Sequence, residues 1–173
     1  EQVRRFKERI FISPEIRRAL PSIPSNFTRG LLSNVKIIDL DISDKNLIKL
    51  KRDREIALEK GFLFQENASY TKANVVYEGK IYPIKIRLKG DQLDHLKGNR
   101  WSYRIQLQGE KNILGMKKFS LQVPEVRNYL GEPIFHTLLD FEKIPNLRYE
   151  IVKLKINGKD FGIYTIEEHF DKF

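Results

Sequence analysis

Cysteine is absent from this chain of 173 residues. Its absence excludes a disulfide scaffold, a thiolate metal site and a cysteine nucleophile. No apolar run approaches the roughly 20 residues that a membrane-spanning helix requires, and no signal-peptide pattern is present. A serine nucleophile is disfavoured, because no serine stands in a G-x-S-x-G turn and the three histidines lack a partner at catalytic spacing.

Apolar and basic residues, in contrast, are abundant. Hydrophobic residues make up 40% of the chain and aromatic residues 11%, which is enough for an ordered core. The formal net charge is +9, and residues 80–118 alone hold ten Lys or Arg against three acidic residues. A basic segment this dense indicates an anionic partner: nucleic acid, anionic lipid or the polyphosphate of a nucleotide.

The first 34 residues are predicted to form a helical appendage and a linker, followed by one domain over residues 35–173. Apolar residues at helical spacing favour a basic helix over Gln2–Phe11, and Ser13-Pro14 is typical of the start of a second helix. Residues 21–34 hold two prolines and several small polar residues, which indicates a linker or surface loop.

In the rest of the chain, the spacing of apolar residues predicts several strands and two helices. Strands are expected over residues 35–42, 73–77, 80–89, 101–108, 118–123, 149–156 and 161–166. Glu78-Gly79 and Asn157-Gly158 are expected to form tight turns. Helices are expected over residues 44–60, ending at Gly61, and over residues 124–142.

These elements predict an α+β fold, an antiparallel sheet of about five strands that carries the second helix and follows the N-terminal helices. The order of elements is that of a protein-kinase small lobe, which is an analogy of fold alone. Four residues of the second helix form one apolar stripe that we expect to be buried on the sheet: Leu130, Ile134, Leu138 and Phe141.

Several short motifs in a fixed order resemble the CotH-type atypical kinases, a family named for spore coat protein H. The closing hairpin matches the form NG-x-x-x-G-x-Y-x-x-x-E followed by Asp-Lys, through Asn157, Gly158, Gly162, Tyr164, Glu168, Asp171 and Lys172. Further matches lie at Arg87–Gly90, Arg100–Ile105 and Gly115–Leu121. The order of the motifs carries the resemblance, because each one alone has low specificity.

The resemblance implies the N-terminal, nucleotide-binding lobe of a longer two-lobed kinase. It implies ATP and Mg²⁺ or Mn²⁺ as cofactors, and phosphoryl transfer to protein serine or threonine as the reaction. The family's catalytic and metal-binding aspartates lie in the large lobe, after the point where this sequence ends. The isolated chain is therefore expected to be inactive and to need the missing C-terminal lobe, facing it with an apolar edge of Tyr164, Ile166 and Phe170. A spore, cell-surface or other extracytoplasmic location is favoured, and a signal upstream of Glu1 is compatible with it.

Alternation along the basic strand gives the candidate phosphate ligands. Over residues 84–89 the apolar side chains point to one face, and Lys85, Arg87 and Lys89 point to the other. Arg104 on the next strand falls on the same polar face. Arginine binds phosphate oxygens bidentately and lysine supplies a point charge, so Arg87, Lys89 and Arg104 are the predicted cofactor-binding cations. A solvated sheet face is the alternative reading.

Two glutamates complete the predicted cofactor site through the resemblance. Glu132 takes the helix position that pairs with a strand cation in kinases, with Arg104 or Lys89 as its partner. The other reading of Glu132 is a first-turn acid stabilised by the helix dipole. Glu168 matches the family's glutamate at the junction of the lobes, where the hinge passes the nucleotide base.

The loop Gly90–Gly98 is a second candidate for binding an anion, because its terminal glycines let backbone amides approach a ligand. The family usually has Asn-Ser-Ser after this first glycine, whereas this chain has Asp91-Gln92-Leu93. Asp91 and Asp94 are the candidates for holding a metal such as Mg²⁺, although local capping of the loop is the favoured reading. No catalytic residue is predicted in this chain.

The alternative function is a basic, non-catalytic binding module for polyanions, either RNA or an anionic surface polymer. Basic strands with aromatic residues between them, here Trp101, Tyr103 and Tyr82, are typical of base stacking. Trp101 and Tyr103 fall on the apolar side of their strand, which indicates core positions and makes nucleic acid the less favoured partner.

Overall fold

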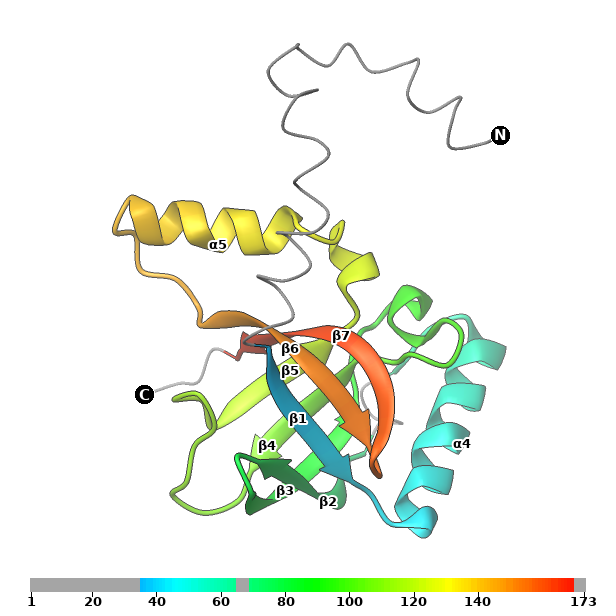
Figure 1. The fold of residues 1–173 in the computed structure, drawn as a ribbon. Coiled ribbons are helices and arrows are strands. Elements are labelled where there is room, and N and C mark those ends of the chain that lie inside the picture. The colour runs from blue at the N-terminus through cyan, green and yellow to red at the C-terminus, as the bar shows by residue number, and fades with distance from the viewer. Residues whose placement is uncertain (1–34, 65–68, 170–173) are drawn as a thin grey trace, which may run out of the picture. The chain divides into compact units, whose positions relative to one another are not determined.

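The computed structural model describes residues 35–64 and 69–169, which form a closed barrel with two helices outside it (Figure 1). The strands follow one another around the barrel in the order β1-β2-β3-β4-β5-β7-β6. They are β1 (Lys36–Asp41), β2 (Thr71–Tyr77), β3 (Lys80–Leu88), β4 (Tyr103–Leu107), β5 (Lys118–Gln122), β6 (Tyr149–Ile156) and β7 (Lys159–Glu168). The helices are α4 (Asp44–Lys60) and α5 (Gly131–Phe141), and two 3₁₀ turns are η1 (Leu93–Leu96) and η2 (Pro124–Arg127).

The predicted antiparallel sheet of about five strands is wrong, because β1 closes the sheet through a parallel pair. β1 pairs antiparallel with β2 on one side and parallel with β6 on the other, where Leu40 lies opposite Ile156. The side chain of Asn157 fixes this junction: it accepts from the Ile42 amide at 2.8 Å and donates to the Ile42 carbonyl at 2.9 Å. Periodicity identifies a strand and its two faces, but it does not identify a partner more than a hundred residues away.

The interior of the barrel is filled by the apolar side of each strand. Ile84, Ile86 and Leu88 of β3 are fully buried, and Tyr103 of β4 is buried as predicted. Tyr164 and Ile166 of β7 are also fully buried. The predicted apolar edge is therefore wrong for these two residues, and Phe170 lies outside the described residues. Closure of the barrel explains the error, because it places the apolar face of β7 inside.

Local turn and helix signals gave correct predictions. Asn157 and Gly158 have φ angles of 52° and 77°, and Glu78 and Gly79 have φ angles of 49° and 71°, as a two-residue hairpin turn requires. α4 ends at Gly61, whose φ is 75° and whose amide donates to the Ala57 carbonyl. The helix packs on β2, β3 and η1.

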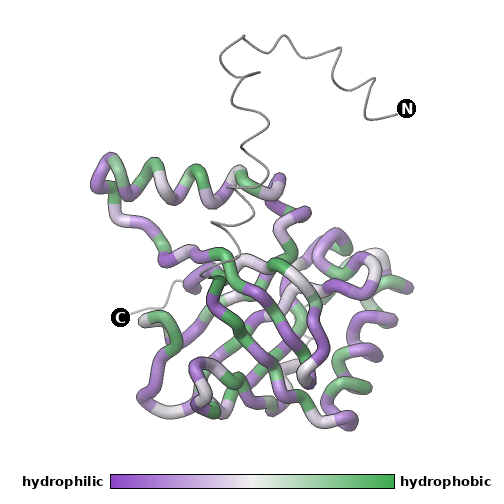
Figure 2. Tube along the Cα trace, in the orientation of Figure 1, coloured by the Kyte–Doolittle hydropathy of each residue, from purple (hydrophilic) through white to green (hydrophobic). Residues whose placement is uncertain are grey.

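The second helix differs from its prediction in both extent and burial. The expected helix over residues 124–142 is interrupted, because Asn128 and Tyr129 adopt left-handed φ angles of 53° and 58° between η2 and α5. The expected burial of its stripe is wrong, since Leu130, Ile134, Leu138 and Phe141 are 42%, 56%, 55% and 79% exposed. α5 stands outside the barrel, and Figure 2 shows hydrophobic residues recurring along it.

The predicted N-terminal helices and linker lie outside the described residues, so the division of the chain at residue 34 stays a prediction. Of the helices in the described ranges, neither α4 nor α5 has the length and apolar character needed to cross a membrane.

Candidate functional site

A continuous row of polar side chains crosses the outer face of five strands, β3, β4, β5, β7 and β6. The strand register places the following residues next to one another in turn: Arg87, Arg104, Ser120, Glu167 and Tyr149. Neighbouring strands lie about 4.8 Å apart, so successive side chains of the row are within contact range. The prediction that Arg104 shares a polar face with Arg87 is therefore confirmed.

Arg87 and Arg104 form a pair of like charges at one end of this row. Arg87 is 8% exposed, and its guanidinium lies 5.4 Å from the centre of the Tyr70 ring. Burial, followed by the charge of Arg87, lowers the pKa of Arg104. Neither arginine forms an ion pair with a carboxylate within residues 35–64 and 69–169, and the buried Nε of Arg104 has no acceptor there. Like charges on directly opposite residues destabilise a sheet, so an anion bound between them would relieve this repulsion.

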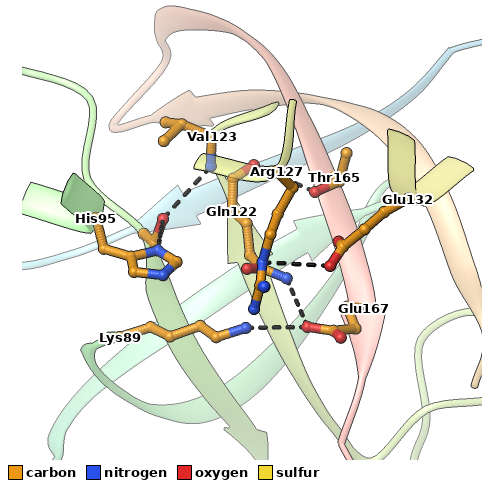
Figure 3. A network of polar contacts seen from close by, with 9 residues as sticks. Lys89, His95, Gln122, Val123, Arg127, Glu132, Thr165 and Glu167 are labelled. Carbon is orange, nitrogen blue, oxygen red and sulfur yellow. Dashed lines mark hydrogen bonds and ion pairs between the residues drawn. The ribbon is translucent and has the colours of Figure 1, made fainter. Parts of the chain in front are cut away.

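Lys89, the third predicted cation, lies directly after the end of β3 and is held by an ion pair. Its Nζ donates to Glu167 Oε2 at 2.9 Å, and the two side chains are only 10% and 20% exposed (Figure 3). Burial lowers the pKa of Lys89, and the charge of Glu167 partly offsets this effect. Gln122, which is fully buried, donates to the same Glu167 oxygen at 2.5 Å. Its own Oε1 has no partner among the described residues.

Glu132 does not pair with Arg104 or Lys89 as predicted. Its Oε1 lies 3.2 Å from Nε of Arg127, which extends from η2 over the polar row (Figure 3). The break in the expected helix accounts for this pairing, because the left-handed residues Asn128 and Tyr129 turn the chain so that Arg127 reaches back to the first turn of α5.

Glu168, the last predicted cofactor ligand, lies apart from the others. Its Oε1 accepts from Arg148 at 2.6 Å, and Arg148 also donates to the Gly115 carbonyl at 3.0 Å. Adjacent residues of a strand point to opposite faces, so Glu167 joins the polar row and Glu168 does not. The structure thus brings Arg87, Lys89 and Arg104 together and separates them from Glu168.

Sequence reasoning missed three members of the site. Gln122 and Glu167 could have been found, since the alternation of β5 and β7 puts both on the polar face. Arg127 could not, because its position depends on the break between η2 and α5.

The loop Gly90–Gly98 forms one wall of an open pocket of about 420 Å³ beside this site. The pocket is lined by Phe62, Asp91, Gln92, Asp94, His95, Val126 and Arg127. Arg127 therefore connects the pocket to the polar row. Asp94 accepts from the amide of the next residue, His95, at 2.9 Å, and no side-chain hydrogen bond among the described residues caps the start of η1. Within the described ranges, no three His, Asp or Glu side chains are grouped as metal ligands.

His95 holds the loop in place. A Cβ added to Gly90, whose φ is 99°, would lie 2.3 Å from the His95 ring, so the ring occupies the space that only glycine leaves. Nδ1 of His95 lies 3.0 Å from Ser102 Oγ, which accepts from the Val123 amide at 3.4 Å (Figure 3). Burial lowers the pKa of His95, so the neutral ring is favoured. This chain of contacts joins the loop to the start of η2.

The arrangement can bind an anion by its arginine pair and hold it near a fixed ammonium. Comparison with protein-family models gives no match for the chain, and comparison with curated protein sequences gives none either.

Proposed function

We propose that Arg87, Arg104 and Lys89 bind the phosphates of a nucleotide, and that this chain is the nucleotide-binding part of a CotH-like atypical kinase. The observation that carries the proposal is the arginine pair: Arg87 and Arg104 lie directly opposite each other on neighbouring strands, and neither forms an ion pair with a carboxylate of the described residues. A guanidinium matches phosphate oxygens with two parallel hydrogen bonds, and partial burial strengthens such bonds. The reaction proposed for the full-length parent is phosphoryl transfer from ATP to protein serine or threonine.

ATP with Mg²⁺ or Mn²⁺ fits the groups on this face. A phosphate oxygen would supply the acceptor that Arg104 Nε lacks, and Lys89 would approach a second oxygen while remaining paired with Glu167. The metal neutralises charge on the triphosphate when it is bound. Asp91 and Asp94 line the adjoining pocket and would be the residues that hold such a metal.

The test is ATP binding by the intact protein, measured by calorimetry. Arg104→Ala is expected to weaken ATP binding by at least about tenfold, because a hydrogen bond to a charged group contributes about 1.5–3 kcal/mol. Arg52→Ala removes an exposed arginine from α4 and serves as the matched control, with affinity unchanged. Equal affinities for the two variants would contradict the proposal.

The alternative is a basic binding module for polyanions, and the salt dependence of binding distinguishes it from a nucleotide site. Tight RNA binding that falls steeply with salt, together with undetectable ATP binding, would favour it over a nucleotide site.

A further inference from the structure

A second basic row runs across the same outer face, one step from the arginine pair toward the start of β3. The register places Lys72 of β2 opposite Lys85 of β3, Lys85 opposite Gln106 of β4, and Gln106 opposite Lys118 of β5. We name these four residues the lysine row. Lys72 and Lys85 are exposed, whereas Gln106 and Lys118 are half-buried.

The lysine row borders a shallow open pocket of about 390 Å³. Lys85, Gln106 and Lys118 line it together with Lys117 and Glu110 from the neighbouring loop. Glu110 is the carboxylate of this lining, and it is paired with Lys117 at 2.8 Å. Among the described residues, no carboxylate forms an ion pair with Lys72 or Lys85.

Two pairs of like charges therefore stand on neighbouring rows of one face. Lys72 opposes Lys85, and Arg87 opposes Arg104. Lys85 and Arg87 are two residues apart on β3, which separates the rows by about 6.6 Å. Each pair is unfavourable for the sheet by itself, and the two together concentrate positive potential that attracts an extended anion.

We propose that the lysine row binds an acidic peptide segment. Four strands spaced by about 4.8 Å span about 14 Å, the length of four to five extended residues at about 3.3 Å each. Alternate carboxylates of such a segment share one side, where they would meet Lys72 and Lys85. The Gln106 amide, between the cations, has both a donor and an acceptor for a peptide backbone.

A nucleic acid fits this face less well than a peptide does. Its bases need free aromatic rings. The Tyr70 ring already carries the Arg87 guanidinium, and the Tyr82 ring packs against the core, on the opposite side of β3 from Lys85.

The role of the bound peptide rests on the proposed function. With a nucleotide's phosphates on Arg87 and Arg104, an acidic segment on the lysine row would lie beside them. The substrate class that follows is a protein whose acceptor hydroxyl is flanked by Asp or Glu.

The experiment measures the affinity of the intact protein for a fluorescent peptide of alternating Glu and Ser by anisotropy. Lys72→Ala combined with Lys85→Ala is expected to weaken binding by about tenfold, as the loss of two surface ion pairs predicts. The matched control is Lys45→Ala combined with Lys51→Ala, which removes two exposed lysines from α4 and should leave the affinity within twofold. A peptide with Gln in place of Glu is expected not to bind.

Equal losses in the two double variants, or tighter binding of a single-stranded oligonucleotide of the same charge, would overturn the inference. ATP affinity is measured in the same variants, so that failure of the nucleotide site can be distinguished from failure of the acidic-peptide site. Arg104→Ala should lose ATP and keep the peptide, whereas the lysine-row variant should lose the peptide and keep ATP. Peptide binding without ATP binding would refute the proposed function and leave the acidic-peptide site standing.

Discussion

The ion pair between Lys89 and Glu167 should be one of the strongest electrostatic couplings in the barrel. Lys89→Met removes the ammonium and leaves the Glu167 carboxylate, whose side chain is 20% exposed, with Gln122 as its remaining side-chain donor among the described residues. Removal of one partner of a buried pair costs about 3–5 kcal/mol. Because Gln122 keeps donating, we expect the lower end, about 3 kcal/mol. With an m-value of about 2 kcal/mol/M, the urea midpoint should fall by about 1.5 M.

A double-mutant cycle isolates the pair itself. Glu167→Gln keeps the acceptor for Gln122 and should cost about 2 kcal/mol, since the buried Lys89 can lose its proton. The double variant should lose no more than Lys89→Met alone, which gives a coupling energy of about 2 kcal/mol. The matched control is the exposed pair Lys153–Asp160, at 2.6 Å with side chains 36% and 51% exposed, where a coupling below about 1 kcal/mol is expected. Equal coupling in the two cycles would mean that water screens Lys89 as it screens a surface residue, and the buried site would be refuted.

Three further outcomes follow from single contacts. Gly90→Ala should lower the unfolding free energy by more than about 2 kcal/mol in urea titrations, because its Cβ would meet the His95 ring at 2.3 Å; a change below about 0.5 kcal/mol would contradict that contact. Burial lowers the pKa of His95, so the unfolded chain binds the proton more strongly than the folded chain does. The unfolding free energy should therefore fall as the pH drops below about 6.5. His95→Gln should remove this pH dependence between about pH 5 and 7. Asn157→Ala should lower the unfolding free energy by about 2–3 kcal/mol, because it removes both hydrogen bonds to Ile42 and places alanine at a left-handed φ of 52°. Phe141→Ser, at a side chain that is 79% exposed, should change the urea midpoint little.

The positions of the strands, and the face on which each of their side chains lies, depend on neighbouring residues and could therefore be predicted from the sequence. The alternation of Ile84, Ile86 and Leu88 with Lys85, Arg87 and Lys89 correctly separated the core from the polar face. Asn157-Gly158 turns as a hairpin because asparagine and glycine tolerate positive φ, which is a property of the two residues themselves.

Only those parts of the candidate site that depend on the alternation of side chains along a strand could be predicted from the sequence. Arg87 and Arg104 share a face through their parity and the pairing of adjacent strands, both of which the sequence indicates. Glu132 was assigned the wrong partner, because a continuous helix was assumed across Asn128 and Tyr129. The role of either glutamate in binding a cofactor stays a prediction.

The sequence by itself determined the turns, the strands and the side chains that each strand offers to either face, because these depend on neighbours within a few residues. The tertiary structure alone decided that β1 runs parallel to β6, that Tyr164 lies inside a closed barrel, and that the apolar stripe of α5 stays exposed. The physical reason is that burial and pairing belong to contacts between distant segments. Periodicity specifies that a face is apolar, but not which surface, if any, will cover it.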